Sequence, residues 1–469
     1  MTTQGIFYEA AVVLDVVAII SALWRTQGAE RTLMWIFAIL AFPIAGSLAY
    51  FFLANPSVKR TTIRKRAASR RVGRRLASKP SSAPLQRDTS IAALAANITY
   101  QEATKGNSVN LLPEAPAAFE SVMEAIKAAK KSIWVEFYII AHDETGVRFL
   151  RQLADSAAAA IEVRLLYDAV GSIGIDDGLL LDIEASGGKV KAFHPLSPFA
   201  KRWSVHLRNH RKLMIIDGEL VLTGSMNVGN EYSWRFLKKG NQRYKDVHLS
   251  VRGPAVRDFS VIFAEDWAFA AGDVPPIPEP PPPFPEAGAT IAVIPSGPDQ
   301  QINASAFLFF TGIAGAKRSV YITTPYFIPD EPLVRALQSA ALRGVDVRIM
   351  LPSRADSPLV GYAGRYYYPE LLKAGVRIFE YGAGMLHSKT MIIDDELAMV
   401  GSANLDVRSM KLNFELGLLV WDEGFTKELS ARCRAAYESS REIRNFALSS
   451  RGVLVQALEK AARLLSPIL

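Results

Sequence analysis

The feature that most constrains this chain is an internal duplication in the part that follows residue 105. Residues 132–143 (SIWVEFYIIAHD) can be laid over residues 319–330 (SVYITTPYFIPD), and similar helical and apolar segments surround both copies in the same order. The repeat is far longer than the 20–50 residues typical of solenoids, so a short-period array is excluded. The sequence therefore predicts two copies of one folding unit.

Each copy alternates between helical patterns and unbroken apolar strands. Helices are expected at residues 116–130, 146–159, 304–317 and 331–342. Strands are expected at residues 162–167, 190–193 and 220–223, and at residues 346–351, 376–379 and 397–400. This alternation is typical of a largely parallel sheet that is covered on both faces. We expect an α/β fold in which two repeats with mostly parallel sheets pack about a pseudo-twofold axis.

A proline-rich segment separates the two copies. Residues 274–285 (VPPIPEPPPPFP) contain eight prolines, which neither a helix nor a central strand tolerates, so a stiff polyproline II connector is expected. The expected domains are two transmembrane helices (1–56), a basic juxtamembrane linker (57–105), a first repeat (106–273), the connector (274–287) and a second repeat with C-terminal helices (288–469).

Two apolar runs begin the chain, at residues 6–24 and 33–53. A helix needs about 20 residues to cross the hydrocarbon core of a bilayer. The second run has no charged residue, and a lipid-embedded helix tolerates its Pro43 and Gly46. The first run contains Asp15, which is costly at mid-bilayer and is expected to face the partner helix. The short connection predicts a transmembrane hairpin.

The positive charge of the chain is concentrated directly after these runs. Residues 57–88 hold eleven Lys or Arg and one acid, which accounts for the whole net charge of +8. Basic residues next to a membrane segment predict that residues 57 onward face the cytoplasm and the anionic leaflet of the membrane. Binding of nucleic acid is a secondary alternative for this basic run, and the simplest alternative is a solvated tether without a binding role. The single cysteine, Cys433, excludes a disulfide framework and a thiolate metal site.

Each copy ends in a segment rich in polar side chains. The first has His210, Lys212 and Asp217 and then Gly224-Ser225-Met226-Asn227; the second has His387, Lys389 and Asp394 and then Gly401-Ser402-Ala403-Asn404. The two histidines are 177 residues apart, and every polar position recurs in step. Residues two apart on a strand share a face, so an imidazole and an ammonium group converge in each copy. A single His-x-Lys pair on a strand would often be an ordinary surface feature, but two full copies in matching places indicate a functional site.

The pattern His-x-Lys-x4-Asp followed by Gly-Ser-x-Asn, present twice, resembles the phospholipase D superfamily. Residues 326–352 (YFIPDEPLVRALQSAALRGVDVRIMLP), 385–415 (MLHSKTMIIDDELAMVGSANLDVRSMKLNFE) and 244–256 (YKDVHLSVRGPAV) are similar to bacterial cardiolipin synthases in particular. The resemblance covers about residues 110–445 and implies that two phosphatidylglycerols give cardiolipin and glycerol, without a metal or another cofactor. It also implies a multi-pass protein of the bacterial inner membrane.

The resemblance also implies roles for the residues. His210 is expected to be the nucleophile that forms a phosphatidyl-histidine, and His387 the proton donor and acceptor. Sequence symmetry alone does not order these two. Lys212 and Lys389 would neutralise the transition state, while Asp217 and Asp394, which complete the motif, are better suited to stabilising a turn.

Further polar residues have expected supporting roles. Phosphate oxygens are expected to bind Ser225, Asn227, Ser402 and Asn404. Asp246 and Glu415, which follow these cradles in equivalent places, are the candidates that orient the histidines, by the logic of a catalytic triad.

Three other functions remain open from the sequence. A hydrolase that releases phosphatidate, or a transferase that uses phosphatidylethanolamine or another polyol, would have the same motifs. A nuclease would also share the active site. A non-catalytic scaffold that binds anionic lipid through residues 57–88 is an alternative of another class. Residues 453–465 suggest an amphipathic helix and a homo-oligomer.

Overall fold

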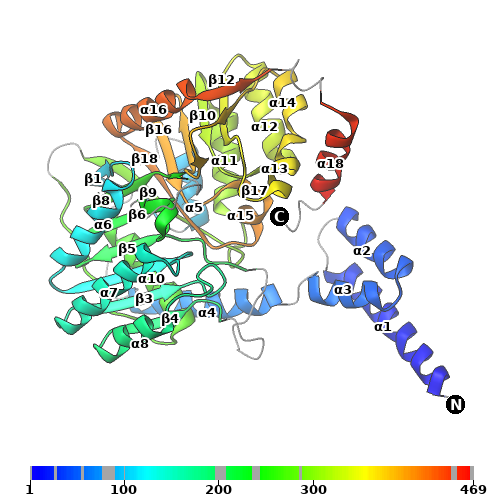
Figure 1. Ribbon diagram of the computed structural model, residues 1–469, viewed down its shortest axis with the longest axis horizontal. Coiled ribbons are helices and arrows are strands. Elements are labelled where there is room, and N and C mark those ends of the chain that lie inside the picture. The colour runs from blue at the N-terminus through cyan, green and yellow to red at the C-terminus, as the bar shows by residue number, and fades with distance from the viewer. Residues whose placement is uncertain are drawn as a thin grey trace. The chain divides into compact units, whose positions relative to one another are not determined.

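The computed structural model describes residues 3–25, 29–53, 57–76, 90–99, 101–195, 207–234, 243–284, 288–444 and 451–464. The chain divides into two compact units, Met1–Ile63 and Arg64–Leu469. Figure 1 shows the elements of both units. All of the repeated sequence belongs to the larger unit.

The smaller unit is built on three helices, α1 (Thr3–Arg25), α2 (Ala29–Ala41) and α3 (Ala45–Leu53). The second expected membrane span is wrong as one continuous helix, because Pro43 and the left-handed Ile44 (φ 63°) separate α2 from α3. Asp15 of α1 holds this break, since its Oδ1 accepts hydrogen bonds from the Ile44 N–H (3.0 Å) and the Ser47 hydroxyl (2.5 Å).

The expected transmembrane hairpin is therefore corrected. Among the helices that the structure describes, none combines the length and the apolar character needed to cross a membrane. The interpretation of Asp15 as a residue that faces its partner helices is consistent with its two hydrogen bonds.

The larger unit is organised around one continuous sheet of 15 strands. Its first half contains, in spatial order, β1 (Thr104–Leu111), β8 (His248–Arg252), β6 (Leu220–Gly224), β5 (Leu213–Ile216), β2 (Ser132–Phe137), β3 (Glu162–Tyr167) and β4 (Lys189–Ala192). Its second half contains β9 (Ala289–Ser296), β18 (Glu415–Trp421), β16 (Leu397–Gly401), β15 (Thr390–Ile393), β10 (Ser319–Thr323), β12 (Asp346–Pro352), β13 (Arg377–Tyr381) and β19 (Ser440–Ile443).

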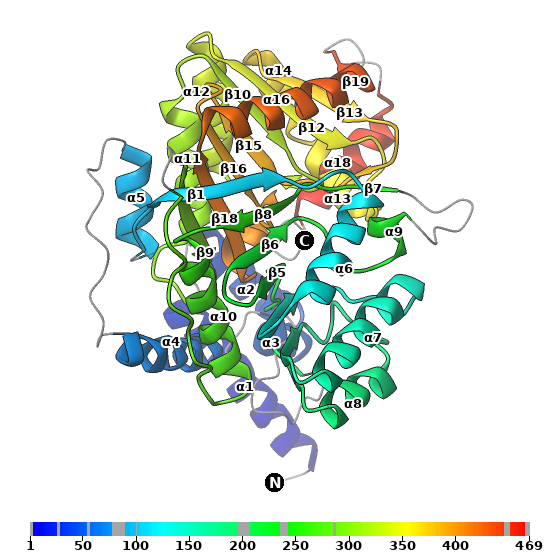
Figure 2. The same ribbon diagram turned by 90° about the vertical axis from the view of Figure 1, so that its left-hand side faces the viewer.

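The strand order repeats in the two halves and confirms the duplication. The halves join at β1, which pairs in antiparallel fashion with β9 of the second half and with β8 of the first; Figure 2 labels all three strands. The expectation of mostly parallel sheets is wrong, because among the described strands of this sheet only β2–β3, β3–β4, β10–β12 and β12–β13 pair in parallel. The tight hairpins β5–β6 and β15–β16, and the strands that follow them, run antiparallel.

Two short parallel pairs lie outside the large sheet, β11 (Phe327–Ile328) with β17 (Leu405–Asp406) and β14 (Met385–Leu386) with β7 (Tyr244–Lys245). The helices of the first half are α6 (Ala117–Ala128), α7 (Glu144–Ala158), α8 (Asp177–Ala185), α9 (Asn230–Ser233) and α10 (Val256–Ala270). Those of the second half are α11 (Ala304–Gly315), α12 (Glu331–Leu342), α13 (Pro358–Arg365), α14 (Tyr368–Lys373), α15 (Val407–Lys411), α16 (Glu423–Glu438) and α18 (Val453–Leu464).

Helices cover both faces of the sheet, because its strands are apolar on both faces. In β2, Ile133, Val135 and Phe137 belong to the core with α6, α7 and α8, whereas Trp134 stacks on Phe263 of α10 (ring centroids 5.1 Å apart). Alternate residues of a strand point to opposite faces, so α10 lies on the other side of the sheet. In the second half, α16 takes the corresponding place, with its Tyr437 against Tyr321 of β10.

Residues 57–105, expected to be a linker, contain two helices in the described part. In α4 (Ser57–Leu76), Ala68 and Val72 are buried. In α5 (Ser90–Thr99), Ile91 and Ala95 join the core of the second half. The remaining linker residues, 77–89 and 100, lie outside the described residues.

The proline-rich connector and the C-terminal helix also contact the repeats. Residues 274–284 form neither helix nor strand, and the Phe284 N–H donates to the Gly106 carbonyl (2.9 Å). In α18, Glu459 and Ala462 are buried, while Leu454, Leu458 and Leu464 are exposed.

The turns that follow β5 and β15 are held by aspartate carboxylates. Asp217 has left-handed backbone geometry (φ 56°), and its carboxylate accepts hydrogen bonds from the N–H groups of Lys130, Lys131 and Ser132 at the start of β2. Asp394 does the same with Lys317, Arg318 and Ser319. The side chains that end the two motifs therefore tie a hairpin to the central strand of each half.

We expect Asp217→Ala to destabilise the larger unit by about 3 kcal/mol, because three backbone N–H groups lose a charged acceptor and alanine is poor in the left-handed region. Urea unfolding followed by circular dichroism measures this change. The neighbouring Glu219→Ala removes an equal charge from an exposed ion pair and should cost less than about 1 kcal/mol. Equal losses in both variants would contradict the role of Asp217.

Candidate active site

The two His-x-Lys segments lie immediately before β5 and β15, where each segment is bound to the opposite half. Asn209 forms a parallel bridge with Phe414, and the His210 N–H donates to the Phe414 carbonyl (2.8 Å). Phe414 directly precedes β18, a strand of the second half. The first motif is therefore positioned by main-chain contacts with the second repeat.

The second motif has the matching arrangement. β14, which leads into it, pairs with β7 of the first half, and the N–H groups of His387 and Ser388 both donate to the Lys245 carbonyl (2.8 and 2.9 Å). The two motifs thus meet along the seam between the halves. The expectation that His and Lys lie within the strands is corrected, because β5 and β15 begin one residue after each lysine.

Each histidine side chain also pairs with a carboxylate of the opposite half. His387 Nδ1 lies 2.7 Å from Oδ1 of Asp246, which belongs to the first half. His210 Nδ1 lies 3.4 Å from Oε1 of Glu415, which belongs to the second half, and the Asn413 amide nitrogen is 3.3 Å from the same ring nitrogen. In each ring Nδ1 faces a carboxylate, so Nε2 is the nitrogen left for chemistry.

The two lysines are held beside the histidines. Lys212 Nζ donates to the carbonyl of His210 (2.6 Å), and Lys389 Nζ donates to that of His387 (2.5 Å). Burial lowers the pKa of Lys212 to about 8 against the pull of Glu415 and Asp246. Burial and the charge of Lys212 lower the pKa of Lys389 to about 7. Both ammonium groups therefore sit in a dry site where a bound anion would be strongly stabilised.

The two histidines differ in their electrostatics. Burial, followed by the charges of Lys212 and Arg408, holds the pKa of His210 well below its usual value. Burial and Lys389 also lower the pKa of His387, but the charge and hydrogen bond of Asp246 oppose them.

The two carboxylates differ in the opposite sense. Burial raises the pKa of Glu415 to about 7. The pKa of Asp246 is lowered, because the charges of His387 and Lys389 and the hydrogen bond from His387 outweigh its burial. His387 therefore has a firmly ionised partner, whereas His210 does not.

The two serines expected to bind phosphate form hydrogen bonds with Glu415 and with the backbone next to Glu415 and Asp246. Ser402 Oγ donates to Glu415 Oε2 (2.5 Å) and accepts from the Leu416 N–H (2.9 Å). Ser225 Oγ accepts from the Val247 N–H (3.0 Å), next to Asp246. These hydrogen bonds fit a positioning role for both hydroxyls, and contact with a phosphate stays a prediction.

The two asparagines are buried near the seam. Asn227 Oδ1 accepts from the Ile139 N–H (3.3 Å) and its Nδ2 donates to the Tyr232 hydroxyl (3.1 Å), while the Asn404 N–H donates to Ser409 Oγ (3.2 Å). Asp217 and Asp394 lie at the far ends of β5 and β15 from the histidines, bound to backbone N–H groups. The structure thus brings together His210, Lys212, His387, Lys389, Asp246 and Glu415, and leaves the two aspartates outside.

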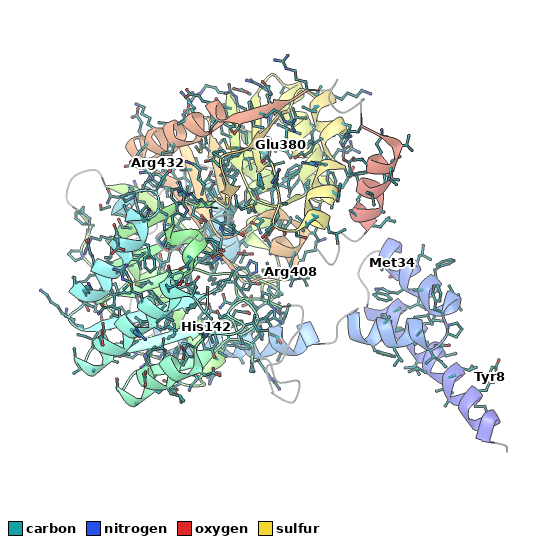
Figure 3. The ribbon with its side chains drawn as sticks, in the orientation of Figure 1. Tyr8, Met34, His142, Glu380, Arg408 and Arg432 are labelled. Carbon is teal, nitrogen blue, oxygen red and sulfur yellow. The ribbon has the colours of Figure 1, made fainter. Side chains whose placement is uncertain are left out.

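Several neighbours of His210 were not predicted from the sequence. The ring of Tyr138 lies 4.0 Å from the His210 ring, centroid to centroid. Arg408 of α15 influences the pKa of His210, and Figure 3 shows it where the two halves of the larger unit face each other. Asn413 and Arg408 both lie in the quoted segment 385–415, but they have no counterpart in the first motif that would have marked them.

Comparison with known proteins agrees with this geometry. The sequence matches the family model for the cardiolipin synthase phospholipase D-like domain over residues 122–267 and 310–436, and the phospholipase D-nuclease N-terminal family over residues 13–55. It is 34% identical to a cardiolipin synthase of Geobacillus thermodenitrificans over 94% of this chain and 89% of that protein. It is 39% identical to cardiolipin synthase A of Pseudomonas fluorescens over 77% and 75% of the two chains.

A solved structure shares the fold. The crystal structure of phosphatidylserine synthase from Haemophilus influenzae aligns with a TM-score of 0.59, at 16% identity, over 81% of this chain and all of that one. At this identity the likeness concerns the fold alone.

We expect Asp246→Asn, a change in the first half, to lower the pKa of His387 in the second half by about one to three pH units, because a charge within hydrogen-bond distance is lost. The pKa of His210 should stay nearly constant. Nuclear magnetic resonance titration of histidine-labelled protein, assigned with His387→Gln and His210→Gln, measures both rings. A change in the pKa of His210 instead of His387 would show that each histidine pairs with the carboxylate of its own half.

Proposed function

This chain belongs to the cardiolipin synthase family of phospholipase D-like phosphatidyltransferases, and we propose that it transfers a phosphatidyl group from one phosphatidylglycerol to another through a covalent histidine intermediate. One observation carries the proposal: two imidazoles, each with its own lysine and with a carboxylate of the opposite half, meet at one seam. A phosphodiester is anionic, and the two ammonium groups supply the charge that its transition state requires.

In the first step His210 Nε2 attacks the phosphorus of the donor lipid, and the bond from phosphorus to the glycerol oxygen breaks. His387 donates a proton to that oxygen, so glycerol leaves and a phosphatidyl group remains on His210. In the second step His387 takes the proton of an acceptor glycerol hydroxyl, whose oxygen attacks the same phosphorus. Cardiolipin forms, and both histidines return to their initial states.

The electrostatics support this order of roles. A nucleophilic imidazole must be neutral, and burial, Lys212 and Arg408 keep the pKa of His210 well below its usual value. A proton donor needs a partner that stabilises its cation, and the ionised Asp246 lies 2.7 Å from His387. Glu415, at 3.4 Å, orients His210 with less charge.

We also propose that the smaller unit attaches the enzyme to a bilayer, which brings the catalytic unit to its lipid substrates. Its helices leave many apolar side chains exposed, among them Val13, Val17, Ile20, Phe37 and Leu40. Transfer of such side chains from water to lipid is favourable. The orientation toward the cytoplasm, and a homo-oligomer, stay predictions.

The function is tested with purified full-length protein and vesicles of phosphatidylglycerol labelled in the phosphatidyl group. We expect cardiolipin and free glycerol from the wild type. With His387→Ala, which lacks the proton donor, we expect slow formation of an adduct on His210 that peptide mass spectrometry locates. His210→Ala is the matched control and should carry no label.

The same assay separates the competing functions. Phosphatidate without cardiolipin would indicate a hydrolase, and product from phosphatidylethanolamine vesicles alone would indicate another donor. Label on His387 in the His210→Ala variant, and never on His210, would reverse the two roles. Activity on DNA without activity on lipid would indicate a nuclease, and an inactive wild type that binds anionic vesicles would indicate a scaffold.

We expect kcat/KM to depend on pH with a maximum near neutrality. Glu415, with a pKa of about 7, becomes protonated as the pH falls below that value and no longer supports His210. As the pH rises above about 7, Lys389 loses its charge, and Lys212 follows above about pH 8, so the charges that bind phosphate are lost. Glu415→Gln should remove the acid limb, and Lys389→Arg, which stays charged, should move the alkaline limb to higher pH. A profile that is flat from pH 5 to pH 9 would contradict this electrostatic account.

A further inference from the structure

A network of buried charges lies behind the first His-x-Lys motif. Arg211, between His210 and Lys212, forms an ion pair with Asp266 of α10, and its Nε donates to the Glu415 carbonyl (3.1 Å). Glu136 of β2 accepts from Asn209 Nδ2 (2.5 Å). Both chain neighbours of His210 are therefore fixed by buried carboxylates.

Helix α4 supplies the second cation of this network. Lys65 Nζ lies 2.7 Å from Asp266 Oδ1, and its side chain is only 1% exposed although it comes from the basic segment. Glu265 is further away, at 3.9 Å. Buried ammonium groups are costly unless they are paired, so the position of Lys65 indicates a specific role rather than a solvated face.

The rest of the helix is fitted to the same surface. Arg71 donates to the carbonyls of Ala268 (3.0 Å) and Gly272 (2.8 Å) at the end of α10, and Arg66 Nε donates to the Asp299 carbonyl (2.6 Å). The contacts of Arg71 hold α4, a segment outside both repeats, against the first half, and the contact of Arg66 ties it to the second half.

The second half has a neutral arrangement at the equivalent place. Ser388, which corresponds to Arg211, donates to Thr323 Oγ1 (3.2 Å), and Thr323 corresponds to Glu136. Thr323 in turn shares a hydrogen bond with Thr390 (2.7 Å). Among the residues that the structure describes, the charged network thus accompanies the motif that contains His210 and not the other motif.

We propose that Lys65 is a positioning residue of the active site, which acts through Asp266 and Arg211 on the pair formed by Glu415 and His210. The inference rests on the proposed function of His210. Without Lys65, Arg211 alone balances the charge of Asp266, since burial and Asp266 hold the pKa of Glu136 well above its usual value. The guanidinium is then drawn away from the Glu415 carbonyl, and the strand that carries Glu415 loses one of its anchors. Docking of α4 on the first repeat is therefore a condition of full activity.

The test compares Lys65→Met with Lys65→Arg in full-length protein on phosphatidylglycerol vesicles. Lys127→Met, which removes one charge from an exposed helical lysine of α6, is the control. We expect Lys65→Met to lower kcat roughly tenfold or more with little change of KM, because small misplacements of reacting groups are costly. The acid limb of kcat/KM should move to higher pH, since the surroundings of Glu415 become more negative. Lys65→Arg should restore most of kcat, and Lys127→Met should match the wild type.

Thermal unfolding of each variant separates positioning from stability. Unchanged kcat in a folded Lys65→Met protein would overturn the proposal, as would a loss that follows the folded fraction with no movement of the acid limb. If Lys65→Met does not fold, Lys65→Gln replaces it, with the same expectations. If the wild type makes no cardiolipin, the proposed function fails separately. The role of Lys65 is then tested by the pKa of His210, measured by nuclear magnetic resonance in the wild type and in the Lys65 variants. An unchanged pKa would overturn the inference.

Discussion

The catalytic arrangement depends on the exchange of contacts across the seam between the two repeats. The N–H of each histidine donates to a carbonyl of the other half, Phe414 for His210 and Lys245 for His387. The next residue after each of these carbonyls is the acid that pairs with the same histidine. Main-chain register and side-chain pairing are thus set by the same few residues. Neither half contains a complete histidine–carboxylate pair, so the site exists only when both repeats have folded and joined.

The duplication provides two equivalent positions, and substitutions around them make the positions chemically different. Asp246 is short, close to His387 and ionised, whereas Glu415 is longer, further from His210 and has a raised pKa. The proposed transfer in two steps would use this difference, since in it one imidazole attacks while the other moves a proton. Two identical environments would give neither imidazole a preference for either role.

The sequence predicted what depends on local pattern and on repetition. The helices and strands of both copies, the two His-x-Lys motifs and the importance of Asp246 and Glu415 all follow from periodicity and from matching positions. The sequence did not predict which acid serves which histidine, because two symmetric copies are compatible with either pairing. The mostly parallel sheet was wrong, although the turns at Asp217 and Asp394 already require antiparallel hairpins. A continuous helix through Pro43 was predicted because a lipid-embedded helix tolerates proline. The helix breaks there instead, and Asp15 accepts the hydrogen bonds that stabilise the break between two short helices.

The charged network behind His210 explains why sequence reasoning gave Glu136 and the basic segment no joint role. Glu136, Arg211 and Asp266 lie on three elements, and Lys65 lies on a fourth, outside the repeats. In the sequence each residue is one charged residue in an apolar or basic stretch, and nothing there links it to the others. Burial in the folded protein links them, because a buried charge needs a partner nearby. Strand β2 carries Glu136 where β10 carries Thr323, and the first motif carries Arg211 where the second carries Ser388. Both differences place the charged residue in the copy that contains His210, so the duplicated site has a charged support beside one of its two histidines.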